Sequence, residues 1–99
     1  MDDFEVRRGK VLLGILRLLD VDQPWFMCEF APTPDFEDVK PLFDEELRRL
    51  EVIDDDIDAW ENAYSRIDEL GLQIVPPGGG PPLTEFVLHI EGNRARFTK

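Results

Sequence analysis

The sequence predicts an α+β protein, with an antiparallel sheet of about six strands in β-β-β-α-α-β-β-β order and helices packed on one face. Three observations lead to this prediction. The first third of the 99 residues shows strand-like patterns between turn signals, the middle third has apolar residues at helical spacing, and the last third contains a hairpin. A single domain, residues 1–99, is expected for a chain of this length.

The first third is expected to form three strands, at residues 4–7, 11–19 and 25–30. Phe4 and Val6 alternate with charged residues, and Gly9 suits the first central position of a two-residue turn. Residues 11–19 are apolar on both faces, so a buried helix remains an alternative. A strand is favoured because Gly14 would cost a helix interior about 1 kcal/mol. Arg17 then faces the core, unless a β-bulge turns it outward.

The middle third is expected to be helical. Thr33 and Pro34 suit the start of a short helix, and a longer helix follows from about residue 41 to residue 52. The run of aspartates 54–56 precedes a further helix that ends at Gly71. Two apolar stripes face the core: Phe36, Val39, Phe43, Leu47, Leu50 and Ile53 in the first part, and Ile57, Trp60, Tyr64, Ile67 and Leu70 in the second.

The last third returns to strands. Residues 72–75 form a short strand, residues 76–82 contain only proline and glycine and form a loop, and residues 85–91 and 94–98 form a hairpin. In this hairpin Leu88 and Ile90 face the core, whereas His89 and Glu91 face the polar side together with the arginines of the second strand. The expected core contains Phe36, Phe43, Leu47, Leu50, Trp60, Tyr64, Ile67, Leu88, Ile90 and Phe97.

The charge balance limits the classes of partner. The chain has 11 basic and 22 acidic residues, a net charge of −11, so nucleic acid is an unfavourable ligand. No apolar run approaches the ~20 residues of a membrane span, and the acidic N-terminus does not resemble a signal peptide. A single cysteine forms no internal disulfide. A cytoplasmic protein without a membrane partner is therefore expected.

Catalytic groups are few. His89 is the only histidine and Cys28 the only cysteine, and the predicted strands place them on opposite faces of the sheet. They cannot then form a nucleophile–base pair. Cys28 is interpreted as a core residue and His89 as a surface residue. An acid–base pair of His89 with Glu85 or Glu29 remains an alternative, so the sequence leans away from an enzyme without excluding one.

Metal and phosphate motifs are incomplete. Asp54, Asp56 and Asp58 match the first three ligands of a calcium-binding loop, but Ala59 stands where that loop needs glycine and Ser65 where it needs glutamate. The three glycines at 78–80 lack the lysine and hydroxyl residue of a phosphate-binding loop. No cofactor or metal is expected.

Two surfaces are expected to meet partners. Residues 35–69 carry 14 acidic and 4 basic residues, so the helical layer is strongly negative and suits electrostatic docking of a basic protein. The docking face is predicted to contain Asp44, Glu45, Glu51, Asp55, Asp58 and Glu61. The second surface is an apolar outer face of the first three strands, which a second copy of the chain would cover. Its predicted contacts are Leu12, Leu16, Leu18, Trp25 and Met27.

These features together predict a non-enzymatic interaction module that acts as a homo-oligomer, most simply a dimer. The first alternative is an acidic docking protein, similar in principle to an inhibitor or immunity protein, that binds a basic partner. The second alternative is a small hydrolase or isomerase that uses a Glu/His pair.

Overall fold

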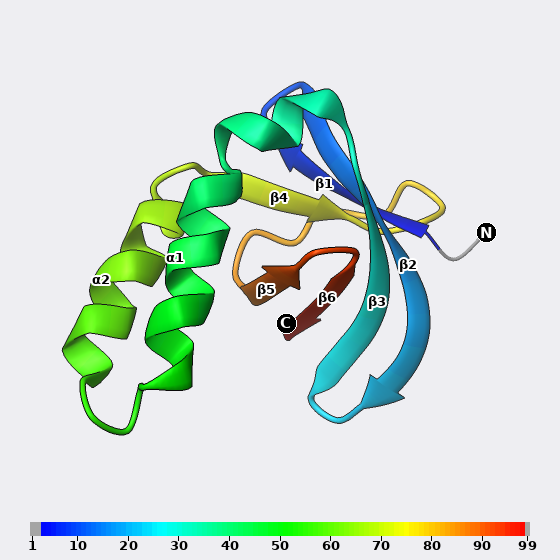
Figure 1. The fold of residues 1–99 in the computed structure, drawn as a ribbon. Coiled ribbons are helices and arrows are strands. Elements are labelled where there is room, and N and C mark those ends of the chain that lie inside the picture. Colours follow the sequence, from blue (N-terminus) through cyan, green and yellow to red (C-terminus); the bar gives the residue numbers. More distant parts are fainter. Residues whose placement is uncertain (1–2, 99) are drawn as a thin grey trace.

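The protein has the α+β architecture that the sequence predicts (Figure 1). The structure is a computed structural model that describes residues 3–98. The helical elements are the 3₁₀ helix η1 (Pro34–Asp38), α1 (Lys40–Glu51) and α2 (Ile57–Asp68). The strands are β1 (Asp3–Arg8), β2 (Val11–Asp22), β3 (Trp25–Pro32), β4 (Leu72–Val75), β5 (Val87–Glu91) and β6 (Arg94–Thr98).

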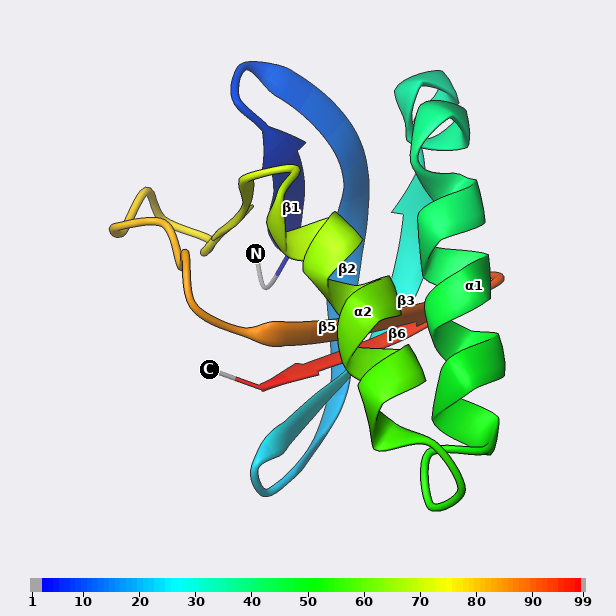
Figure 2. The ribbon, with the colours of Figure 1, turned by 90° about the vertical axis from the view of Figure 1, so that its left-hand side faces the viewer.

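All six strands belong to one antiparallel sheet, in the order β4-β1-β2-β3-β6-β5. The sheet is strongly curled, and α1 and α2 lie side by side on one side of it (Figures 1 and 2). The alternative of a helix at residues 11–19 is wrong, because this segment pairs with β1 and β3 along its length. The loop at residues 76–82 has no helix or strand, as predicted.

The core fills the inside of the curl and extends to the helices. Of the ten predicted core residues, seven are buried, and each large apolar side chain contributes about 1.5–3 kcal/mol when it is removed from water. The buried seven are Phe36, Phe43, Tyr64, Ile67, Leu88, Ile90 and Phe97. The other three, Leu47, Leu50 and Trp60, are half-buried.

A β-bulge in β2 decides which side chains reach the core. Val6 faces Gly14, but the next residue of β1, Arg7, faces Leu12, so Leu13 is the extra residue. An extra residue reverses the alternation of side chains along the strand beyond it. Leu16 is consequently buried, and Arg17 turns outward, where its guanidinium lies 4.0 Å from the carboxylate of Glu29.

The predicted dimer face is therefore wrong in its central residues. Leu16 has no exposed surface, so it is not available to a second copy, and Leu18 is half-buried on the same core-facing side of β2. Leu12, Trp25 and Met27 are half-buried within the chain. Homo-oligomerisation stays a prediction, which light scattering tests, but it no longer has this surface as its basis.

The helix starts differ in how they are capped. Asp56 precedes α2, and its side chain accepts a hydrogen bond from the backbone N–H of Ala59 at 3.0 Å, as the run of aspartates predicts. Thr33 is the N-cap residue of η1, as predicted, and its carbonyl accepts from the N–H of Phe36 at 3.0 Å, but its side chain makes no capping bond. The Thr33 hydroxyl donates instead to the carbonyl of Leu12 at 2.6 Å. This bond ties the start of η1 to β2.

Tyr64 on α2 satisfies the backbone of β5. The backbone N–H of Leu88 donates to the Tyr64 hydroxyl at 2.8 Å, and this hydroxyl donates to the carbonyl of Phe86 at 3.4 Å. Burial is the main reason why the pKa of Tyr64 rises from 10.0 to about 12, although the Leu88 N–H opposes the rise. Tyr64 thus contributes to stability as a neutral phenol.

We expect Tyr64→Phe to lower the free energy of unfolding by about 1–3 kcal/mol, because the buried N–H of Leu88 loses its acceptor. The raised pKa of Tyr64 also makes the free energy of unfolding depend on pH. The contribution of Tyr64 is constant below pH 10 and declines as the pH rises toward about 12, since the unfolded chain releases its phenolic proton first.

Urea denaturation of the wild type and Tyr64→Phe across this pH range measures both effects. The chain has one tyrosine, so the ultraviolet absorbance of tyrosinate reports its ionisation directly. An equal loss of stability in both proteins between pH 10 and 12 would contradict the role of Tyr64.

Candidate functional site

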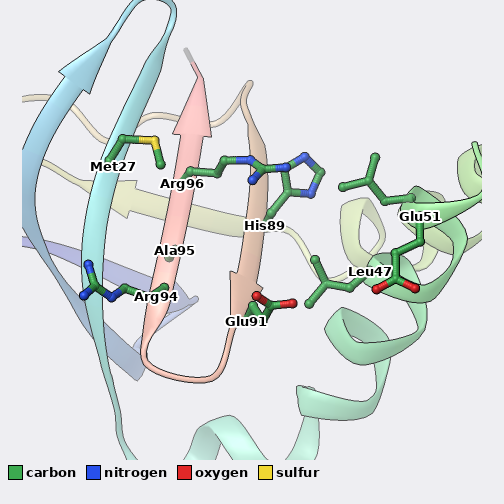
Figure 3. Close-up of a pocket in the computed structure, with 9 residues that line it drawn as sticks. Met27, Leu47, Glu51, His89, Glu91, Arg94, Ala95 and Arg96 are labelled. Atoms are coloured by element: carbon green, nitrogen blue, oxygen red, sulfur yellow. The ribbon is translucent and has the colours of Figure 1, made fainter.

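The candidate site is a groove between α1 and the outer face of β5 and β6, here called the α1–β6 groove (Figure 3). It encloses about 250 Å³, which is slightly below the usual volume of a small-molecule pocket. Its walls combine apolar side chains with charged groups of both signs. The lining residues are Met27, Leu47, Leu50, Glu51, His89, Glu91, Arg94, Ala95 and Arg96.

His89 lies in the wall of this groove and is buried, with 5% of its surface exposed. The prediction that it is a surface residue is wrong. Its register with Arg96 places it on the polar side of the hairpin, as expected, but α1 covers that part of the strand. Nδ1 of His89 lies 2.8 Å from Oε1 of Glu46. Because carboxylate oxygens only accept, the imidazole ring donates at Nδ1.

Glu46 is a fully buried carboxylate on α1. Its second oxygen, Oε2, accepts a hydrogen bond of 2.6 Å from the indole N–H of Trp60 on α2. Glu46 therefore joins α1, α2 and β5 through one side chain. Both of its oxygens have a donor, as a buried carboxylate requires.

Sequence reasoning missed Glu46, although the sequence contains a signal for it. Glu46 lies three residues after Phe43 and four before Leu50, so it occupies the apolar stripe of α1. A carboxylate on a core-facing stripe needs a buried donor. Trp60 and His89, the donors that the structure supplies, lie in other elements, so their contact with Glu46 depends on the tertiary fold.

Arg96 and Trp25 complete this part of the site. The Arg96 guanidinium carbon lies 5.2 Å from the centre of the Trp25 ring, and the Trp25 ring lies 5.5 Å from the His89 ring. A guanidinium over an indole face gains a cation–π attraction. Among residues 3–98, neither Arg96 nor Arg94 forms an ion pair with a carboxylate.

Cys28 lies on the opposite face of the sheet from His89, as predicted. It is in register with Ala95, whereas Met27 is in register with Arg96 and so shares the outer face with His89. Burial raises the pKa of the Cys28 thiol to about 11. The thiol is thus protonated at neutral pH, and it cannot serve His89 as a nucleophile.

The predicted carboxylate partners of His89 are placed elsewhere. Glu29 and Glu85 are exposed, and Glu29 lies beside Arg17. The pairing of His89 with either residue is therefore wrong, and Glu46 takes this place. The described residues contain no group of three or more His, Cys, Asp or Glu side chains arranged to hold a metal.

The six residues of the predicted acidic docking face do not form one uniform surface. Asp44 is paired with Lys40, and Glu45 with Arg48 and Arg49. Hydrogen bonds from these two arginines, chiefly Arg48, lower the pKa of Glu45. Glu51 lines the α1–β6 groove. The remaining residues are exposed at the α1–α2 turn and on α2, and docking of a basic protein there stays a prediction: Asp55, Asp58 and Glu61.

The fold and groove together define a small α+β protein with one charged, partly apolar groove beside a buried Glu–His pair. Within residues 3–98, none of the helices has the length and apolar character needed to cross a membrane. Comparisons with protein-family models, with curated proteins and with solved structures gave no match. The geometry of the groove is therefore the basis for a functional assignment.

Proposed function

We propose that the protein is a non-enzymatic interaction module and that the α1–β6 groove is its binding site. The observation that carries this proposal is the state of Arg96. Its side chain lines the groove and has no carboxylate partner among residues 3–98, in a chain whose net charge is −11. Hydrogen bonds that involve a charged group contribute about 1.5–3 kcal/mol, so this guanidinium group favours binding of a ligand with acceptor atoms.

The surroundings of Arg96 support binding. Leu47, Leu50 and Met27 give the groove an apolar wall, and small-molecule sites characteristically combine apolar walls with a few polar groups. The Glu46 network holds the wall in place, because it fixes α1 relative to β5.

Proton transfer by His89 is the second candidate function. Glu46 fixes the ring through Nδ1, which is the arrangement that prepares a histidine for acid–base chemistry at Nε2. A compound that is converted by the wild type, and that His89→Asn still binds but no longer converts, would favour this candidate over the interaction module.

Solvent mapping by NMR tests the binding proposal without assuming a ligand. Isopropanol and phenol, titrated separately into the ¹⁵N-labelled protein, should shift mainly the amides of residues 47–51 and 89–96. We expect Leu47→Trp, which places an indole in the groove, to abolish these shifts. Val11→Trp is the matched control, because Val11 is 44% exposed on β2, outside the groove.

Shifts that concentrate elsewhere on the protein, or that persist unchanged in Leu47→Trp, would show that the groove is not the binding site. Light scattering on the protein before any probe is added determines whether the free protein is a monomer or a dimer.

A further inference from the structure

The α1–β6 groove has ends of opposite charge. His89 and Arg96 are register partners at one end. Glu91 lies two residues further along β5 on the same face, which corresponds to about 6.8 Å along the strand. Glu51 and Leu47 extend from α1 toward this second end, where Leu47 lies between the side chains of Glu91 and Glu51 (Figure 3).

The first end has the geometry of a carboxylate site. Arg96 presents a planar guanidinium that forms no ion pair with any of residues 3–98, and Trp25 limits its orientation. Guanidinium groups bind carboxylates through two parallel hydrogen bonds. At His89, Nδ1 donates to Glu46, so Nε2 of the neutral ring is an acceptor and the donors for a ligand carboxylate come from Arg96.

The second end suits an ammonium group. In the described chain neither Glu91 nor Glu51 forms an ion pair, and both are exposed. Arg94 is in register with Glu91, but its side chain extends away from it toward β3 (Figure 3). An ammonium group has three donors and no acceptor, so the Glu91 carboxylate can accept from it.

We infer that the groove binds a small zwitterion, with a carboxylate and an ammonium group separated by a short apolar chain. The carboxylate lies against Arg96, the ammonium group lies against Glu91, and the chain lies on Leu47. This inference rests on the proposed function of the groove and assigns the chemical class of its ligand. A zwitterion would contact both the positive and the negative side chains that line the groove, whereas an anion would contact only the positive ones.

Three probes of matched length test the assignment. ε-Aminocaproate carries both charged groups, caproate lacks the ammonium group, and hexylamine lacks the carboxylate. Titration calorimetry and NMR at neutral pH and low salt should give an affinity for ε-aminocaproate about tenfold higher than for either single-charge probe, since each end adds a charged hydrogen bond.

Two variants separate the ends of the groove. Arg96→Gln should reduce the affinity for ε-aminocaproate to that for hexylamine and leave hexylamine binding unchanged. Glu91→Gln should reduce it to the affinity for caproate and leave caproate binding unchanged. Arg17→Gln and Glu29→Gln are matched controls, because this pair lies outside the groove. They should leave all three affinities unchanged.

Equal affinities for the three probes, or losses in the groove variants no larger than in the controls, would overturn the zwitterion assignment. The solvent mapping keeps the two proposals distinct. If isopropanol and phenol map to the groove while ε-aminocaproate shows no advantage, only the ligand class is wrong. If no probe maps to the groove, both proposals fail.

Discussion

Replacement of Glu46 by alanine is expected to lower the free energy of unfolding by about 3–5 kcal/mol, a large share of the ~5–15 kcal/mol that stabilises a typical domain. Glu46 has no exposed surface, and it is the acceptor for both His89 and Trp60. The substitution leaves two donors without a partner and creates a cavity at the junction of α1, α2 and β5.

Glu45 provides the matched control in the neighbouring position. It forms ion pairs with Arg48 and Arg49 on the surface of α1, and exposed pairs of this kind contribute about 0.2–1 kcal/mol. Urea denaturation of Glu46→Ala and Glu45→Ala measures the difference. Glu46→Gln should fall between them, because one amide oxygen cannot replace two carboxylate acceptors. Similar losses in Glu45→Ala and Glu46→Ala would mean that the buried network does not stabilise the fold.

Gly14→Ala is expected to destabilise the protein by about 3 kcal/mol or more through overpacking. A Cβ atom at Gly14 would lie 2.4 Å from Cε1 of Phe30 and 2.9 Å from the carbonyl oxygen of Ala31. Phe30 is 1% exposed and packs edge-on against Phe36, with ring centres 4.9 Å apart, so the ring has little room to move.

A double-mutant cycle with Phe30→Leu tests this cause, since the shorter side chain removes the two ring atoms that obstruct the new Cβ. The double variant should lose less stability than the sum of the single variants. Gly80→Ala is the control, because its Cβ would meet only Cγ of Pro76, at 3.3 Å. Additive effects in the cycle would show that the Phe30 ring is not the obstacle.

Most of the fold could be predicted because local patterns agree with the tertiary structure. The hairpin of β5 and β6 has the predicted pairs, from Ile90 with Ala95 to His89 with Arg96, because a two-residue turn fixes the register. The helices follow from the spacing of Phe43, Tyr64 and similar residues. The side chains of β2 that face the core were harder to predict. Apolar residues occur on both faces of this strand, so the position of the β-bulge at Leu13 decides that Leu16 is buried.

The site could be predicted only in part, because the groove depends on where α1 lies. Alternation correctly placed His89 and Cys28 on opposite faces of the sheet. It could not show that α1 covers His89, because that contact joins residues 43 positions apart in the chain. The sequence predicts Arg96 only as one polar member of a hairpin pair, because its lack of an ion pair with residues 3–98 depends on how all of its neighbours are placed in the fold.

The contacts at the two borders of the sheet limit how a partner can approach. At β5 the N–H of Leu88 is bound to Tyr64, and at β4 both the N–H and the carbonyl of Ile74 are bound to Leu83, at 3.1 and 2.8 Å. Border strands with free backbone groups invite an extended chain to add itself as a further strand. At these positions an incoming chain would first have to displace a bond within the protein. Binding of a partner by addition of a strand to the sheet is therefore disfavoured at these positions, so side chains rather than free backbone groups would determine which partner binds.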